Sequence, residues 1–199
     1  MKVLAACTDN PNAPDNSGMS PICVAALFGH IDVVKVLAAC TKNPNAPDNF
    51  GRTPILAAAQ KGHAEIVKVL VACTDNPNAS NNNGISPIMA AAEKGHADII
   101  RVLAACTDNP NAHTAHTGIT PIYVAALFGH IDVVRELAAY TDNPNAPNNA
   151  GWTPSYIAAM YGHTDVVNLL TFCTNNPNVL ACAKNLLLMK NSGHKTFKS

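Results

Sequence analysis

The feature that most constrains this chain is a string of 33 residues that recurs along its length. The copy at 41–73 reads TKNPNAPDNFGRTPILAAAQKGHAEIVKVLVAC, and related strings begin at Thr8, Thr74, Thr107, Thr141 and, in altered form, Thr174. Successive copies start 33 residues apart, except for a spacing of 34 between Thr107 and Thr141. A fixed period of this size indicates stacked units in one elongated domain, not a closed globule.

Each copy predicts a turn followed by two short helices. In the copy at 41–73, residues 48–51 (Asp-Asn-Phe-Gly) are typical of a turn, and Thr53 and Pro54 are a favourable N-cap and first helical residue. Gly62 is expected to end the first helix, and apolar residues over 66–70 form one face of the second. Helices of about two turns do not persist alone in water, so each copy must pack on the next.

These residues resemble the ankyrin repeat. The pattern Asp-x-x-Gly-x-Thr-Pro-apolar-x-x-Ala-Ala-x-x-Gly-His runs from Asp48 to His63, and it returns with small changes in the copies that end at His30, His96, His130 and His163. The resemblance implies an all-α ankyrin-repeat solenoid of stacked helix-turn-helix units with β-hairpin tips. It also implies a role in binding other proteins.

Applied to the whole chain, the resemblance implies three regions. Residues 1–13 would be a partial N-terminal repeat that contains only a second helix, and residues 14–179 would be five ankyrin-like repeats. Residues 180–199 would form an atypical C-terminal capping helix and tail. Terminal units of a solenoid are expected to differ from the inner ones because one of their faces has no neighbour.

The chain departs from the family pattern at two positions in each copy. The family has a histidine after Thr-Pro-Leu that ties the turn to the helix, and here that position holds Cys23, Leu56, Met89, Tyr123 and Tyr156. We therefore expect packing to supply the stability there. The glycine that ends the second helix in the family is replaced by Thr41, Thr74, Thr107 and Thr141. Threonine is strained at positive φ, so we expect the chain to leave this helix through a Thr or Asp side-chain turn.

One repeat position holds cysteine in five copies: Cys7, Cys40, Cys73, Cys106 and Cys173. Helical layers are about 8–10 Å apart, beyond the Cα separation of roughly 7 Å that a disulfide tolerates. We expect these residues to be small buried apolar groups without disulfides. Free thiols suit a reducing environment, so the cytoplasm or another reducing intracellular compartment is the expected location.

Composition and motifs argue against several classes of function. Formal net charge is zero, so we expect no electrostatic attraction to nucleic acid or to an anionic membrane. No apolar run approaches the roughly 18–20 residues of a membrane span. The sequence has no nucleophile elbow, phosphate loop, HExxH motif or paired catalytic carboxylates. We therefore expect neither enzymatic activity nor a cofactor.

The histidines do not predict a metal site. One series stands at repeat spacing, too far apart to share an ion, and we expect local hydrogen bonds at the second-helix start from His30, His63, His96, His130 and His163. His113 and His116 lie in the copy with the extra residue but have no Cys or carboxylate partner beside them. The inserted residue is expected to reshape the tip and not to bind zinc.

Under the resemblance, the tips and first helices face a concave surface that binds a partner protein. The tip candidates are Met19, Phe50, Arg52, Ile85, His116, Ile119 and Trp152. The first-helix candidates are Leu27, Phe28, Gln60, Lys61, Glu93, Lys94, Leu127, Phe128, Met160 and Tyr161. Met, Phe, Tyr, Trp and Arg are enriched in interface cores and hot spots. The predicted function is a protein–protein interaction module.

Two other hypotheses stay open from the sequence. The chain could be a structural spacer, a section of a longer ankyrin array that positions other domains. Weak self-association through the N-terminal layer is a third hypothesis, because exposed apolar patches mark contacts. The resemblance also raises hydroxylation of the asparagine that follows each Asn-Pro, a hypothesis weakened by the proline, at Asn12, Asn45, Asn78, Asn111 and Asn145.

Overall fold

The computed structural model describes residues 10–175, which divide after Thr107 into two compact units. The first unit contains the helices α2 (Pro21–Leu27), α3 (Ile31–Cys40), α4 (Pro54–Lys61), α5 (Ala64–Val71), α6 (Pro87–Lys94) and α7 (Ala97–Ala104). The second unit contains α8 (Pro121–Leu127), α9 (Ile131–Ala138), α10 (Pro154–Met160) and α11 (Thr164–Asn175). The partial repeat expected before residue 10 and the capping helix expected over 180–199 lie outside the described residues.

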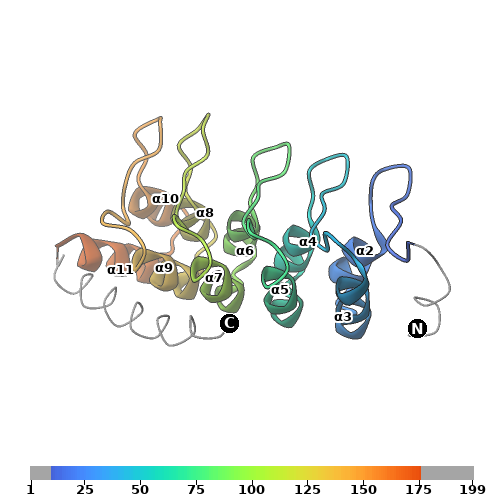
Figure 1. The fold of residues 1–199 in the computed structure, drawn as a ribbon. Coiled ribbons are helices and arrows are strands. Elements are labelled where there is room, and N and C mark those ends of the chain that lie inside the picture. Colours follow the sequence, from blue (N-terminus) through green and yellow to red (C-terminus); the bar gives the residue numbers. More distant parts are fainter. Residues whose placement is uncertain (1–9, 176–199) are drawn as a thin grey trace. The chain divides into compact units, whose positions relative to one another are not determined.

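Each repeat is a pair of antiparallel helices, and the pairs stack within each unit (Figure 1). In the first unit, α4 packs between α2 and α6, and α5 packs between α3 and α7. In the second unit, α8 packs on α10 and α9 on α11. These contacts confirm the predicted stack of helix pairs.

The loops that project beyond the helices are turns, and no strand occurs between residues 10 and 175. In the second repeat, the Asp48 N–H donates to the Arg52 carbonyl at 3.0 Å, and the Gly51 N–H donates to the Asp48 carbonyl at 2.9 Å. These two backbone hydrogen bonds close the tip as a turn, and they are too few to form a β-ladder between two strands. The β-hairpin part of the fold prediction is therefore not confirmed.

The first helix of each repeat starts as the sequence predicts. Thr53 has extended backbone angles, and its Oγ1 accepts the Leu56 N–H at 3.1 Å, while Pro54 occupies the first helical position. The same N-cap bond is made by Ser20, Ser86, Thr120 and Thr153. These caps satisfy a backbone donor that has no partner within the helix.

A second bond at the same helix start comes from the loop asparagine. Asn45 is 5% exposed, and its Oδ1 accepts the Ile55 N–H at 3.0 Å. The equivalent bond is made in every described repeat, by Asn12, Asn78, Asn111 and Asn145. Packing is present at the position of the missing histidine, where Leu56 is buried, and the asparagine adds a hydrogen bond that joins the loop to the helix.

Small and branched apolar residues fill the space between the helices. On the first helices, Ile55 and Ala58 are fully buried, and on the second helices so are Val67 and Leu70. The corresponding residues of the other inner repeats are equally buried, and alanine at the first-helix contact allows close approach of neighbouring helices. This repeated core explains why adjacent pairs stabilise one another.

His63, His96 and His163, which precede second helices, lie against the preceding repeat, and the side-chain hydrogen bond expected at the helix start is not made at the caps that the structure describes. Side chains of His30, His63, His96 and His130 make no N-cap bond. A Cβ added to Gly62 would lie 2.7 Å from the His96 ring, which shows how closely the ring covers that glycine. In the second unit, His163 Nε2 lies 3.1 Å from the carbonyl oxygen of Leu127 in the preceding repeat.

The threonine that follows each second helix forms the predicted side-chain turn in some copies only. Thr41 has an extended backbone, with φ −117°. Oγ1 of Thr74 accepts the Asn76 N–H at 3.3 Å, and the same side-chain turn occurs at Thr141. Thr107 differs, because its hydroxyl donates to the Leu103 carbonyl. Two copies thus use the expected turn.

The cysteine series is not part of the core. Cys40, Cys73 and Cys106 are exposed and Cys173 is half-buried, so the prediction that this repeat position is buried is wrong. The physical reason is that α5 and α7 end before Cys73 and Cys106 are reached, and the apolar contacts have already been made one turn earlier. The cysteines of the described region are all free thiols.

We expect Gly62 to be required for stability for two reasons that can be measured separately: its positive φ and its contact with the His96 ring. Gly62 has φ +83° and lies against the His96 ring, whereas Gly84 has φ +77° and no atom within 4 Å of an added Cβ. Gly84→Ala should therefore report only backbone strain, about 1–2 kcal/mol. Gly62→Ala should destabilise the chain by about 1–3 kcal/mol more, because a methyl group overpacks the ring. Urea unfolding followed by circular dichroism measures both, and equal losses would contradict the histidine contact.

The loop asparagine is expected to contribute more stability than an exposed asparagine. Asn45→Ala leaves the buried Ile55 N–H without its acceptor, which should lower the free energy of unfolding by about 1–3 kcal/mol. The matched control is Asn83→Ala at an exposed tip position, which should change it by less than about 0.5 kcal/mol. The same denaturation experiment compares them, and an Asn45→Ala loss no larger than the control would refute the role of this bond.

Candidate functional site

The predicted binding residues lie on tips and at first helices, and none of them is buried. Mostly exposed are Phe28, Phe50, Arg52, Gln60, Lys61, Ile85, Lys94, His116, Phe128, Trp152, Met160 and Tyr161. Half-buried are Met19, Leu27, Glu93, Ile119 and Leu127. The two units each carry part of this set, and we refer to it below as the tip face.

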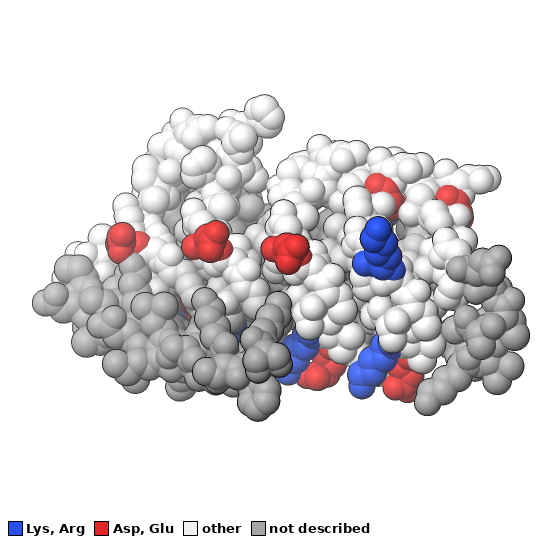
Figure 2. Space-filling view, in the orientation of Figure 1, with Lys and Arg blue, Asp and Glu red and all other residues white. Residues whose placement is uncertain are grey.

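Exposed apolar side chains and exposed charges separate between two surfaces. Among the large apolar side chains exposed within residues 10–175, all but Phe172 are on tips or at first helices. The second helices instead carry paired charges, such as Lys68 with Glu65 at 2.7 Å and Arg101 with Asp98 at 3.1 Å. In the view of Figure 2, most of the visible surface is uncharged, and basic groups stand beside acidic ones at its lower edge.

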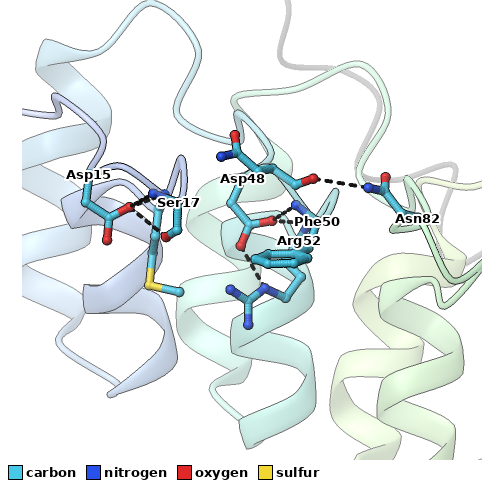
Figure 3. A network of polar contacts seen from close by, with 8 residues as sticks. Asp15, Ser17, Asp48, Phe50, Arg52 and Asn82 are labelled. Atoms are coloured by element: carbon cyan, nitrogen blue, oxygen red, sulfur yellow. Dashed lines mark hydrogen bonds and ion pairs between the residues drawn. The ribbon is translucent and has the colours of Figure 1, made fainter.

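The tip of the second repeat holds a network around a buried carboxylate (Figure 3). Oδ1 of Asp48 accepts the N–H groups of Phe50 at 2.9 Å and Arg52 at 2.8 Å. Its Oδ2 accepts Nε of Arg52 at 2.7 Å, and the Asp48 side chain is only 1% exposed. Cζ of Arg52 stands 5.2 Å from the centroid of the Phe50 ring. The guanidinium is therefore held by a carboxylate and an exposed ring.

The charge state of this tip follows from its hydrogen bonds. Burial acts to raise the pKa of the Asp48 carboxyl, but bonds from the Arg52 amide and guanidinium and from the Phe50 amide outweigh it and lower the pKa. Cys23 lies nearby, where burial and then the Asp48 charge raise the pKa of its thiol to about 11. Asp48 is thus ionised and Cys23 is protonated near neutral pH, so this thiol is not a nucleophile.

Hydrogen bonds join the tips within each unit. Asn49 donates its backbone N–H to the Ser17 carbonyl at 3.0 Å and its side-chain amide to the Asn16 carbonyl at 3.3 Å. Asn82 does the same one repeat later, with the carbonyls of Phe50 at 3.1 Å and Asn49 at 3.1 Å. The three tips of the first unit therefore form one connected row. In the second unit, Asn149 makes both bonds to the preceding tip.

The second unit presents aromatic side chains along α10. The rings of Trp152 and Tyr156 lie 5.8 Å apart at a tilt of 54°, and Met160 and Tyr161 are exposed at the other end of the helix. Tyr156 is 50% exposed and was missing from the predicted set. The repeat pattern hides it, because Tyr123 at the equivalent position is 6% exposed beneath its neighbours.

Burial raises the pKa of the Tyr123 hydroxyl, and the nearby Tyr161 adds to this effect. The predicted Phe128 lies in a stacked arrangement with His130, with ring centroids 6.2 Å apart. Aromatic groups of this unit are thus partly organised by one another, which limits the rotamers that their exposed side chains can adopt.

Neither a metal centre nor a membrane span is found in the described region. Between residues 10 and 175, no group of three or more His, Cys, Asp or Glu side chains could hold a metal ion. His113 Nδ1 lies 3.3 Å from the neighbouring Thr114 carbonyl, and His116 is exposed at the tip. None of the described helices has the length and apolar character needed to cross a membrane.

Comparison with known families agrees with the geometry. The family model for ankyrin repeats (3 copies) matches the chain twice, over residues 22–114 and over residues 88–181. Together the two matches cover residues 22–181, which contain every helix described above except for the first residue of α2. No curated protein matches the chain.

The lowered pKa of Asp48 predicts a specific loss of stability in acid. A carboxylate whose folded-state pKa is lowered stabilises the native state above its ordinary pKa of about 3.9, and this contribution is lost as the pH falls through the lowered value. Asp48→Asn should keep the turn, because Asn81 and Asn148 accept the same two backbone N–H groups in their own tips. The variant should therefore be less stable than wild type near neutral pH, and this difference should shrink below about pH 4.

Urea unfolding at neutral pH and at about pH 2–3 measures this difference. The control is Asp75→Asn, which removes an exposed carboxylate that accepts no hydrogen bond in the described structure. A stability gap between wild type and Asp48→Asn that is independent of pH would contradict the assignment.

Proposed function

The chain belongs to the ankyrin-repeat family, and on this premise we propose that it binds a partner protein through the tip face. Ankyrin repeats are generally protein-interaction modules and typically non-enzymatic. The observation that carries the proposal is the concentration of exposed aromatic and apolar side chains on the tips and first helices. The second helices α5, α7 and α9 carry ion pairs in their place, and such a surface has little to gain from apolar burial.

The side chains of the tip face suit a protein interface. Each Phe, Tyr or Trp can bury about 150–250 Å² on contact with a partner, and these types dominate interface energetics. Phe28, Phe50, Trp152 and Tyr161 project from tips or helix ends, where a partner can reach them. Few charged groups on this face would have to lose water on binding, which lowers the penalty for association.

Preorganisation supports the same proposal. The tips of each unit are hydrogen-bonded to one another, and the Asp48 network fixes the turn that carries Phe50. Ordering loops and side chains on binding reduces affinity, so loops that are already ordered lose less. The tip face therefore combines rigid backbone with large exposed side chains.

We propose a reducing intracellular compartment for this module, without a cofactor and without nucleic acid or membrane as its partner. The free, exposed thiols of Cys40, Cys73 and Cys106 would be exposed to oxidation outside a reducing environment. Zero formal net charge provides no general attraction to polyanions.

A capture experiment tests the tip face. Replacing Phe28, Phe50 and Trp152 together by alanine should reduce recovery of partner proteins from an extract of the source cells at least roughly tenfold, since interface hot spots contribute about 2 kcal/mol or more each. Phe172→Ala is the matched control, because this phenylalanine is 52% exposed but lies on the second helix α11. Circular dichroism verifies that every variant is folded.

Full recovery of the same partners by the triple variant would rule out the tip face and favour the spacer hypothesis. Loss of recovery with Phe172→Ala alone would move the binding surface to the second helices.

A further inference from the structure

We propose that the tip of the second repeat recognises a carboxylate on the partner, placed beside an apolar side chain. The recognising groups are Arg52 and Phe50, with Asp48 as the positioning residue. This inference rests on the proposed protein-binding function and specifies the chemistry of one part of the tip face.

The guanidinium of Arg52 is only partly used within the chain. Its Nε donates to Asp48 at 2.7 Å, and its two terminal nitrogens make no hydrogen bond in the described structure. The side chain is 44% exposed. Two parallel N–H groups of a guanidinium match the two oxygens of a carboxylate, which gives a bidentate and charge-assisted pair.

The position of the Arg52 guanidinium, whose two terminal nitrogens form a fork, is fixed before any partner binds. Asp48 holds Nε from the buried side, and the Phe50 ring lies 5.2 Å from Cζ (Figure 3). A free arginine would lose rotamer freedom on binding, whereas Arg52 has already lost most of it in folding. Phe50 is itself 59% exposed, so an apolar side chain next to the bound carboxylate would meet an aromatic surface.

Charge complementarity favours a carboxylate over a phosphate group. Arg52 is already paired with the carboxylate of Asp48. A phosphate group carries about −1.5 to −2 charges at neutral pH and would meet stronger repulsion from that carboxylate than a single negative charge would. A single negative charge with two oxygens is the better match.

The site occurs at one tip only among the described repeats. The position of Arg52 is occupied elsewhere by Met19, Ile85, Ile119 and Trp152, which have no charge. A partner with one suitably placed acidic residue would therefore be held in one register along the connected tips of the first unit. Apolar contacts would supply affinity, and the Arg52 fork would supply specificity.

Selection from a random peptide library displayed on phage tests the proposal with the full chain as bait. Wild type should enrich peptides that carry Asp or Glu next to a large apolar residue. Arg52→Met should lose the acidic preference and keep the apolar one, and it should fold, because Met19 occupies the same position above the same turn at Asp15. Arg101→Met is the matched control, since it removes an ion-paired arginine from the second-helix surface and should change nothing.

Titration of one enriched peptide then measures how strongly its acidic residue and Arg52 depend on each other for binding. Changing its acidic residue to the amide should weaken binding to wild type roughly tenfold or more, and should have little effect on binding to Arg52→Met. Arg52→Lys should restore only part of the preference, because an ammonium group lacks the fork. A peptide with phosphoserine in place of the acidic residue should bind more weakly than the carboxylate form.

The outcomes separate this inference from the function on which it rests. Two outcomes would overturn the carboxylate site alone. In one, the enriched peptides depend on Phe50 for binding but show no preference for acidic residues. In the other, Arg52→Met selects acidic residues as strongly as wild type does. Tighter binding of the phosphoserine peptide would also overturn it. Failure to select any peptide that depends on Phe50 would overturn both the site and the tip face.

Discussion

Helices of 7 to 12 residues do not persist alone in water, and every other property of this protein depends on how they are held. Each described first helix begins at a Ser or Thr cap and donates a second backbone N–H to a loop asparagine such as Asn45. Each pair then covers the apolar face of the next. The asparagine bond joins residues ten positions apart and the stacking joins separate repeats, so each helix depends on parts of the chain outside itself.

The same repetition produces two different surfaces. Positions that face the neighbouring repeat carry mostly similar apolar residues from copy to copy, whereas the tips and the ends of the first helices vary more widely. Second helices neutralise their charges in pairs such as Glu65 with Lys68. Within residues 10–175, the large exposed apolar side chains other than Phe172 thus lie on the tips and first helices, which is why the partner-binding proposal rests on these positions and not on the fold.

Variation at a single tip shows how a repeat gains a specific property without losing its structure. Asn81 and Asp48 hold their turns with the same two backbone bonds, so the turn itself does not need a charge. The second oxygen of Asp48 is therefore available to fix Arg52 beside Phe50. A structural position that tolerates both residue types becomes the support for a charged group on the surface.

The sequence by itself determined the period, the helix pairs and the caps, because these depend on residues close together in the chain. It also identified the exposed tip residues, since the repeat pattern leaves their types unconstrained. Tertiary structure decided the rest: the buried acceptor role of Asn45, the packing of His96 on Gly62, the exposure of Cys73 and the exposure of Tyr156. Each of these depends on where a helix ends or on which neighbour covers it, and one repeat position in similar local sequence can be buried or exposed accordingly, as Tyr123 and Tyr156 are.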